Sequence, residues 1–197
     1  MSNILYLDNF EVLDVFGPVE VIGKLPNHYA IKYFYPNGGL VISRQDTRIE
    51  TLPFSKISSG GVLLIPGGMG TRALVDDPKF INDIKNIAED SDYVLSVCTG
   101  SALLAKAGLL DNRNATTNKT AFNWVKSNGM NVKWDKNARW IVDGKYYTSA
   151  GVSAGIDMIL GFVADIHGLD IAIEISNYIE YDWNRSKRND KFCYLEK

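Results

Sequence analysis

Two short apolar runs, each followed by a turn and a helical pattern, most constrain the fold of this chain. The runs cover residues 62–65 and 93–97, and neither alternates polar with apolar residues along its length. Strands of this kind are typical of parallel sheets that helices cover on both faces. Further strand-like runs at 3–7, 30–35 and 39–43 are separated by helical patterns. This order predicts an α/β sandwich with a mostly parallel central sheet.

Apolar residues at spacings of three and four predict the main helices. Such patterns span 78–89, 153–167 and 169–183, and Asp76 or Asp77 is the expected N-cap of the first. The other helical patterns cover 101–107, closed by Gly108, and 119–127.

Two further segments are predicted from their turn residues. Pro18 favours the first turn of a helix, so a short helix is expected over 18–24. Residues 131–148 are expected to form a small antiparallel hairpin that turns at Asp143 and Gly144.

The composition fits one domain and excludes several classes of function. The chain has 197 residues, 46% of them hydrophobic, so one domain over 1–197 can bury a full core, with residues 185–197 as a polar C-terminal tail. The net charge of −2 gives no electrostatic footprint for nucleic acid. No apolar run reaches the roughly 20 residues that a membrane span needs. No basic leader and no disulfide framework are recognisable, so a cytoplasmic location is expected.

Cys98 is the candidate nucleophile because of the turn in which it lies. Ser96 and Gly100 supply the small residues that a sharp strand-to-helix turn needs, as in a nucleophile elbow with Cys in place of Ser. The helix N-terminus would favour the thiolate, which is the reactive form of the side chain. The alternative is a structural cysteine buried as a small apolar group. Cys193 lies in the charged tail and is expected to be incidental.

A glycine-rich loop at 65–70 follows the apolar run before it. Gly67, Gly68 and Gly70 free the backbone to direct N–H groups into a cavity. Beside a nucleophile, such a loop predicts an oxyanion hole, with the Thr99 amide as the second donor. The alternatives are a plain tight turn and a phosphate loop, although the G-K-[ST] ending and the G-x-G-x-x-G spacing are missing.

Asp14 is the candidate carboxylate, because it lies between apolar residues after the first predicted strand. One reading makes it the cap of the next helix. In the other, apolar surroundings near the thiol raise its pKa, and it holds or passes a proton. Glu20 is expected to be an ordinary exposed or interface residue.

The two histidines do not support a Cys-His-Asp protease triad. His28 lies in a polar connector and is expected to be solvated. His167 precedes a glycine at a predicted helix end, where it suits the helix dipole. Both are therefore expected to be structural. The loop 115–119, which leaves a short strand, is the third segment expected at the site.

Several motifs together resemble the ThiJ/PfpI family. They are L-D-x-x-G-P-x-E at 13–20, I-P-G-G-x-G at 65–70 and C-T-G-S at 98–101, extended by 107–111, 115–117 and 151–157. The resemblance implies a flavodoxin-like fold related to class I glutamine amidotransferase domains. Within the family, the motifs are most similar to those of isonitrile hydratases and of the amidotransferase-like halves of certain transcription regulators.

The resemblance also implies roles for the matching residues. Cys98 is the nucleophile, Asp14 the carboxylate beside it, and Thr99 contributes its amide and hydroxyl. Gly68 and Met69 contribute the neighbouring amides. Gly70, Thr117 and Asn118, which lie in the same two loops, are further candidates for binding substrate or its developing charge. A small-molecule substrate and a homodimer with the site near its interface are implied, with no metal or organic cofactor.

Asn118 departs from the family pattern, because close relatives have A-T-T-H where this chain has A-T-T-N. Asn cannot act as a base at neutral pH, which disfavours amidase or peptidase chemistry. The predicted activity is cysteine-dependent hydration of an isonitrile to an N-substituted formamide, through a thioimidate on Cys98. The alternatives are a redox- or stress-responsive protein with an oxidisable cysteine and a catalytically silent ligand-binding protein. Without the C-terminal helix-turn-helix domain of the regulators, DNA binding is not expected.

Overall fold

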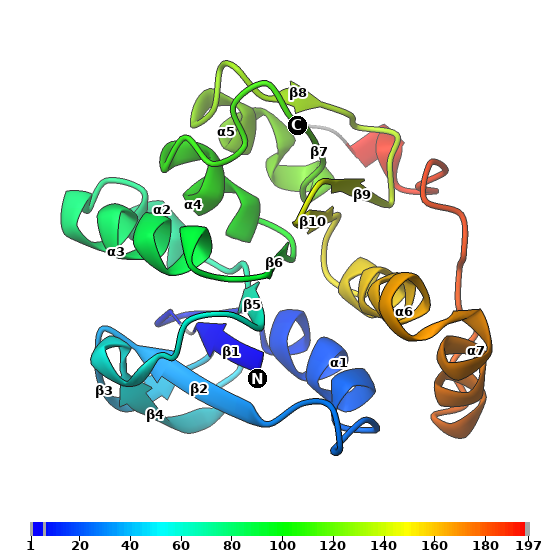
Figure 1. Ribbon diagram of the computed structural model, residues 1–197. Helices are drawn as coiled ribbons and strands as arrows, with labels where there is room; N and C mark the ends of the chain where they lie inside the picture. The colour runs from blue at the N-terminus through cyan, green and yellow to red at the C-terminus, as the bar shows by residue number, and fades with distance from the viewer. Residues whose placement is uncertain (1, 6, 196–197) are drawn as a thin grey trace.

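A central sheet organises the molecule, as seen in a computed structural model that describes residues 2–5 and 7–195 (Figure 1). Its strands are β1 (Ser2–Leu5), β2 (Ile31–Tyr35), β3 (Asn37–Ile42), β4 (Arg48–Pro53), β5 (Val62–Ile65), β6 (Tyr93–Ser96), β9 (Trp140–Asp143) and β10 (Tyr146–Ser149). They lie in the order β3-β4-β2-β1-β5-β6-β10-β9. Neighbours from β4 to β10 are parallel, and only the edge strands β3 and β9 pair antiparallel. β4 was not predicted, and residue 6 of the predicted strand 3–7 lies outside the described residues.

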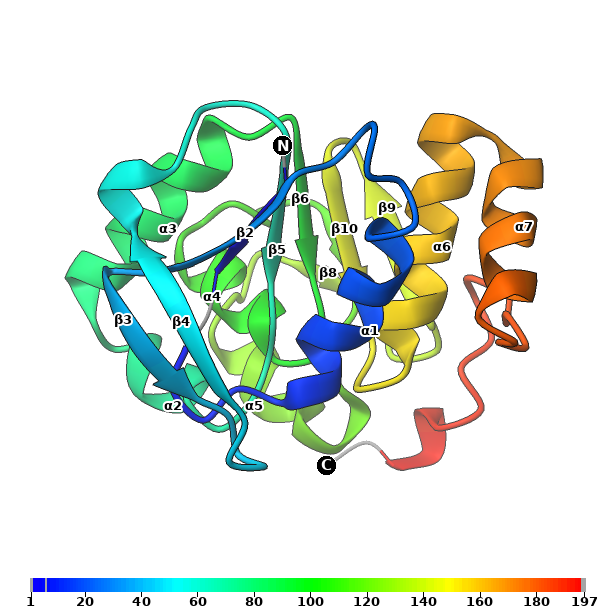
Figure 2. The ribbon, with the colours of Figure 1, turned by 90° about the horizontal axis from the view of Figure 1, so that it is seen from below.

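Helices cover both faces of this sheet. On one side lie α1 (Val12–Ile22), α6 (Ala154–His167) and, outside them, α7 (Leu169–Tyr178). On the other lie α2 (Thr71–Leu74), α3 (Pro78–Glu89), α4 (Gly100–Lys106) and α5 (Phe122–Ser127). Figure 2 shows the same layers from below. The predicted flavodoxin-like three-layer sandwich is confirmed.

The core of the molecule surrounds β5 and β6, the two strands predicted from their apolar runs. All four residues of β5 are buried, and so are Val94 and Leu95 of β6. Burying such a side chain contributes roughly 1.5–3 kcal/mol relative to leaving it in water. The middle strands are therefore held by burial on both faces, which fixes the loops at their carboxyl ends.

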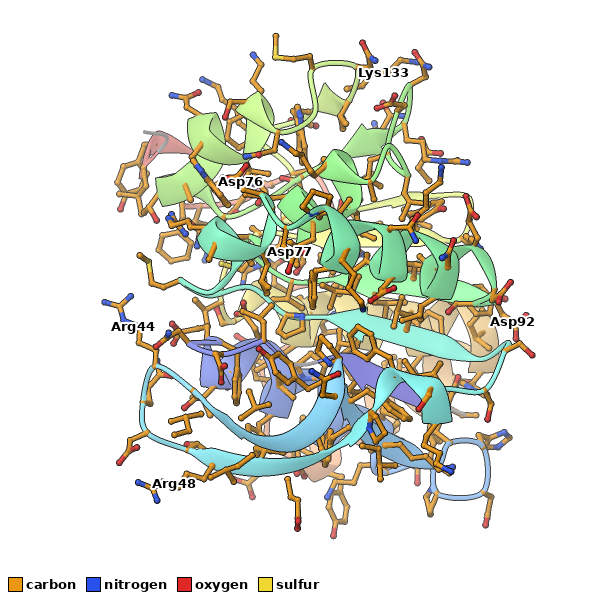
Figure 3. The ribbon with its side chains drawn as sticks, turned by 90° about the vertical axis from the view of Figure 1, so that its left-hand side faces the viewer. Arg44, Arg48, Asp76, Asp77, Asp92 and Lys133 are labelled. Carbon is orange, nitrogen blue, oxygen red and sulfur yellow. The ribbon has the colours of Figure 1, made fainter. Side chains whose placement is uncertain are left out.

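The start of α3 follows the prediction. The Asp77 carboxylate accepts hydrogen bonds from the backbone N–H groups of Lys79 (3.0 Å) and Phe80 (3.1 Å), and Pro78 occupies the first helical position. Asp76, labelled beside it in Figure 3, instead pairs with Lys106 at 3.8 Å. Of the two candidate caps, Asp77 is the one used.

The predicted helix over 18–24 is wrong at its start, because α1 begins at Val12 and Pro18 lies inside it. An interior proline removes a helix hydrogen bond and costs about 3 kcal/mol. Packing against α6 offsets this cost. A Cβ placed on Gly17 would lie 2.7 Å from Ile156 Cγ1, and one on Gly155 would lie 3.6 Å from Pro18 Cγ. Small residues on both helices therefore allow a close approach that the local sequence did not indicate.

Two other predicted helices have different limits. The helix expected over 119–127 begins as a 3-10 turn, η2 (Lys119–Ala121), before α5. The helix expected over 169–183 ends at Tyr178 as α7, and Glu180 has a φ of 50°. A left-handed residue ends the helical hydrogen-bond ladder, which the apolar spacing alone did not reveal.

The predicted hairpin over 131–148 is confirmed only in its second half. β9 and β10 pair antiparallel, and Gly144 and Lys145 form the two-residue loop between them, one residue later than the predicted turn, because Asp143 still pairs with Tyr146. The earlier part does not belong to it, because β8 (Lys133–Trp134) pairs in parallel with β7 (Asn114–Ala115) in a separate small sheet.

The segment after α7 returns across the molecule to the edge where the parallel strands end (Figure 2). It finishes in a 3-10 turn, η3 (Cys193–Leu195). Its backbone is hydrogen-bonded to the rest of the chain: Lys187 O accepts from Arg139 N (2.8 Å), and Asp190 N donates to Asn137 O (2.8 Å). Among the described residues, no helix is long and apolar enough to span a bilayer.

Candidate active site

The candidate site lies at the carboxyl ends of the middle strands. The chain runs from β1 outward to β2 on one side, and to β5 and β6 on the other, so the strand order reverses between β1 and β5. Ligands of open α/β sheets bind at such a switch point. The loops after these strands meet there: Glu11 N donates to Gly67 O at 3.0 Å, and Phe10 forms a bridge to Gly68.

Cys98 occupies the sharp turn between β6 and α4. Its φ is 56°, which is unusual for a residue with a side chain and costs about 1–3 kcal/mol. Its carbonyl oxygen accepts hydrogen bonds from Thr117 Oγ1 (2.8 Å) and Ser101 Oγ (3.1 Å). These two hydroxyls hold the strained turn in place. The small-residue pattern around Cys98 thus predicted the elbow correctly.

Asp14 and Cys98 come together around Gly67. The alternative role of Asp14 as a helix cap is wrong, because Glu11 is the N-cap of α1 and Asp14 lies in its first turn. The Gly67 N–H donates to Asp14 Oδ2 at 2.9 Å. A Cβ on Gly67 would lie 2.8 Å from both Asp14 Oδ2 and Cys98 Cβ. The absence of a side chain at residue 67 is therefore what lets the carboxyl group and the thiol lie so close together.

Burial controls the protonation of this pair. It raises the pKa of Asp14 to about 8, against the hydrogen bond from Gly67, and Asp14 Oδ1 is buried without a hydrogen-bond partner. Burial also raises the pKa of the Cys98 thiol well above its ordinary value, and the charge of Asp14 raises it further. The predicted resting thiolate is thus wrong. The thiol is only 6% exposed, and losing water outweighs the helix N-terminus.

Three donors around the sulfur oppose this increase in pKa. They are the Thr99 amide, the Asn118 side chain and the Thr99 hydroxyl. The orientation of Asn118 is fixed, because its Oδ1 accepts from Ala121 N (3.1 Å) and from Thr120 Oγ1 (2.7 Å). Its Nδ2 is therefore the end that faces Cys98. At this position an amide donor replaces the histidine that the family pattern implied.

The glycine-rich loop is tied to the elbow. The Gly68 N–H donates to Thr99 Oγ1 at 3.0 Å, and Thr71 Oγ1 lies 3.1 Å from the same oxygen. The Gly68 amide thus faces a hydroxyl. Met69 is 48% exposed, and Gly70 is the N-cap of α2. The Gly67 amide binds Asp14 and the Gly68 amide binds Thr99, so the two loop N–H groups nearest Cys98 are already paired and do not form the predicted oxyanion hole in this structure.

The histidines contact each other and not the thiol. The rings of His28 and His167 are 4.7 Å apart, and Tyr29 Oη lies 2.7 Å from His167 Nε2. Glu20 is exposed and pairs with Lys24 at 2.7 Å. In the described part of the chain, no group of three or more His, Cys, Asp or Glu side chains is placed to hold a metal ion.

Three residues that act on the site were missed from the sequence: Thr71, Ser101 and Gly151. The Thr71 hydroxyl acts on Thr99, which no local pattern indicates. The Ser101 hydroxyl acts on the Cys98 carbonyl, and although Ser101 ends the C-T-G-S motif, no role was predicted for it. Gly151 had a signal, because it opens one of the segments that extend the family resemblance, but no role followed from it.

Gly151→Ala is expected to raise the pKa of Cys98. A Cβ on Gly151 would lie 2.0 Å from Asn118 Nδ2 and 3.2 Å from Cys98 Sγ, so the amide would be pushed off the sulfur. A hydrogen bond to a charged group contributes about 1.5–3 kcal/mol, which corresponds to a rise of roughly one to two pKa units. The pH dependence of Cys98 alkylation measures this shift. Gly23→Ala, at the exposed end of α1, is the control, and equal profiles for the two variants would contradict the expectation.

The fold and this site define a class of protein: a flavodoxin-like α/β domain with a cysteine at a strand-to-helix elbow and a carboxyl group beside it. A model of the DJ-1/PfpI family matches residues 3–165. The chain therefore belongs to the DJ-1/PfpI family, as its motifs predicted.

Individual relatives differ in what they do. The chain is 32% identical to an isonitrile hydratase of Pseudomonas putida over 90% of its own length and 76% of that protein. It is 28% identical to a deglycase of Thermococcus kodakarensis, over 74% of this chain and 87% of that protein. A transcriptional regulator of Pseudomonas aeruginosa is 25% identical, and the chain spans 52% of it. Among solved structures, a ThiJ/PfpI family protein of Pseudomonas syringae has a TM-score of 0.84 at 29% identity, covering 92% of this chain and 75% of that one.

Proposed function

We propose that this protein hydrates isonitriles to N-substituted formamides, with Cys98 as nucleophile and Asp14 as proton carrier. One observation carries the proposal: the carboxyl group of Asp14 is buried, this burial raises its pKa to about 8, and it lies beside the buried thiol of Cys98. Asp14 therefore holds a proton at neutral pH and can give it away. The 32% identity to an isonitrile hydratase supports the choice of substrate class.

The first step suits the chemistry of an isonitrile. The terminal carbon carries a lone pair and can accept a proton, after which it is electrophilic. Asp14 gives its proton to that carbon, the Cys98 sulfur forms a bond to the same carbon, and the thiol proton passes to the Asp14 carboxylate. The product is a thioimidate, R–N=CH–S–Cys98, and Asp14 is protonated again. Because the thiol never exists as a free thiolate, its high pKa does not prevent the reaction.

The second step releases the product. Water adds to the thioimidate carbon, and the nitrogen takes up a proton that Asp14 exchanges with this water. The C–S bond then breaks while the new hydroxyl group becomes a carbonyl, and its proton returns to sulfur. The sum is R–NC plus water giving R–NH–CHO, with Cys98 and Asp14 regenerated. The Thr99 amide and the Asn118 amide stabilise the partial negative charge that develops on the sulfur while the C–S bond forms and breaks.

The same geometry argues against the rival functions. Sensor cysteines depend on thiolate character and exposure, whereas Cys98 is buried and its pKa is raised. Amidase and peptidase chemistry through Cys and His lacks its base, because His28 and His167 pack against each other. The proposal keeps the expected small-molecule substrate, cytoplasmic location and homodimer.

The test is to incubate the protein with cyclohexyl isonitrile and follow N-cyclohexylformamide by chromatography. Turnover is expected for the natural chain and for Cys193→Ser, and none above background for Cys98→Ala, because only Cys98 lies beside Asp14. Formamide production that survives removal of the Cys98 thiol would refute the mechanism. A folded natural chain that produces no formamide would refute the function.

A further inference from the structure

The segment after α7 carries a buried charge next to the site. We call residues 181–195 the C-terminal strap; it lies beyond residue 165, where the family match ends. Asp190 of this strap is only 2% exposed. Its carboxylate oxygens lie 3.6 Å from Lys119 Nζ and 3.7 Å from Arg139 Nη1. A carboxylate is rarely buried unless it is paired, so these two cations account for its position.

Lys119 connects the strap to one side of the thiol. It is 3% exposed, and its ammonium group also donates to Thr116 Oγ1 (2.8 Å) and Ala138 O (2.7 Å). Lys119 directly follows Asn118 and opens the 3-10 turn η2, which Asn118 caps. The pair with Asp190 thus lies at the first residue of the turn that Asn118 caps. η2 and η3 are also in contact.

Arg139 connects the strap to the segment around Gly151, on the other side of the Cys98 sulfur. Its Nε donates to Asp157 Oδ2 at 2.7 Å, and its Nη2 lies 3.3 Å from Ser153 Oγ. Its carbonyl oxygen accepts from Ala150 N at 2.9 Å. Gly151 lies inside the segment that these bonds hold, against both Cys98 Sγ and Asn118 Nδ2.

A second anchor keeps the strap in place. Asp157, at the start of α6, receives hydrogen bonds from three strap residues: Tyr181 Oη (3.1 Å) and Asn184 N (3.0 Å) on Oδ1, and Trp183 Nε1 (3.1 Å) on its carbonyl oxygen. Ion pairs therefore join two buried cations to two buried carboxylates in one cluster: Lys119 and Arg139 to Asp157 and Asp190.

We propose that the C-terminal strap is a positioning element of the active site, in which Asp190, through Lys119 and Arg139, holds Asn118 and Gly151 against the Cys98 sulfur. Figure 2 shows the strap at the edge of the sheet where the parallel strands end. The inference rests on the proposed role of Cys98 as the reactive thiol, but not on any particular substrate.

The test measures the thiol itself. Cys98 and Cys193 are alkylated with iodoacetamide between about pH 6 and 10, and each rate is read by mass spectrometry of its own peptide. Asp190→Asn is compared with Asp182→Asn, which removes the same charge from an exposed position of the strap. In Asp190→Asn we expect a higher apparent pKa for Cys98, with alkylation near pH 8 slowed about three- to tenfold, since one pKa unit is a factor of ten. Cys193 is expected to react faster because the strap is loosened.

Two further variants show whether Asp190 acts through Asn118. Asn118→Ala is expected to raise the pKa of Cys98 by at least as much as Asp190→Asn. In the double variant the two shifts should not add, because both remove the same contact. Additive shifts, or an unchanged Cys98 profile in a folded Asp190→Asn protein, would overturn the proposal. If Asp190→Asn does not fold, Asp190→Ser removes the same carboxylate with a smaller side chain, and an unchanged Cys98 profile in that folded variant would overturn the proposal equally.

Labelling of Cys98 shows whether the proposal for the strap fails or the proposed reactive thiol fails. A natural chain whose Cys98 takes no label at any pH would contradict the reactive thiol itself, and the strap's role with it. A labelled Cys98 whose profile does not respond to Asp190 would contradict only the strap.

Discussion

Asp14→Asn is expected to slow isonitrile hydration about 10²- to 10⁴-fold, the usual contribution of a positioned acid or base. Asn can accept the hydrogen bond from Gly67 as Asp14 does, so the shape of the site is retained. It cannot give a proton to the isonitrile carbon or take one from the thiol. The loss should therefore fall on kcat, with little change in substrate binding.

The same substitution is expected to stabilise the fold. The pKa of Asp14 is about 8 in the folded chain and 3.8 for a free side chain. Between about pH 4 and pH 8, Asp14 is therefore protonated in the folded chain and ionised in the unfolded chain. Stability that depends on this proton is complete at acidic pH and is lost as pH rises from about 4 to 8. The full cost at and above pH 8 is about 6 kcal/mol at most, since each pKa unit corresponds to about 1.4 kcal/mol. Asn carries no such cost but leaves a buried N–H group unpaired, at roughly 1–3 kcal/mol.

Urea unfolding of both chains at several pH values checks this second result. Asp14→Asn should be the more stable chain at pH 8, and its advantage should shrink toward pH 4. The hydration rate of the natural chain should fall as pH rises through about 8, when Asp14 loses its proton. Asp8→Asn, an exposed carboxylate in the neighbouring loop, is the control and should change neither property. An Asp14→Asn chain that is less stable at pH 8 would show that Asp14 is ionised in the fold.

The parts of this protein that depend on local patterns could be predicted from the sequence. The apolar runs of β5 and β6 fix the sheet, because burial on both faces requires them. The elbow at Cys98 was predictable because only small neighbours tolerate its φ of 56°. An aspartate cap at residue 76 or 77 was predictable, because an Asp before a helix can reach its free N–H groups, and the structure identifies Asp77 as the one used.

The parts that depend on distant contacts could not be predicted. α1 continues through Pro18 because Gly17 and Gly155 allow α1 and α6 to pack closely. These two glycines are far apart in the sequence, so no local pattern predicts that they meet. The pKa of Cys98 depends on total burial and on Asp14, whereas the sequence indicated only the helix N-terminus. The segment after residue 184 is polar and was expected to be a tail, but its Asp190 is buried against Lys119 and Arg139, which are distant in the sequence.

Arg139→Ala is expected to cause the largest loss of stability, about 3–5 kcal/mol, because it leaves a buried carboxylate without its cation. Arg139 Nε and Asp157 Oδ2 are 2.7 Å apart, and both side chains are buried. Burial already raises the pKa of Asp157, and Arg139 opposes that rise. Without Arg139 the pKa rises further, and Asp190 loses one of its two cations as well.

The pH dependence of the loss separates an orphaned charge from a simple loss of packing. In Arg139→Ala, Asp157 binds a proton more tightly in the fold than when unfolded, so the variant should recover stability as the pH is lowered toward 4. Arg48→Ala is the matched control, because Arg48 points away from the end of the β3–β4 hairpin (Figure 3) and lies 3.9 Å from the exposed Asp46. Such a surface pair contributes about 0–1 kcal/mol. If urea unfolding gave Arg139→Ala the same small loss at every pH, the cluster could not be what holds the strap beside the thiol.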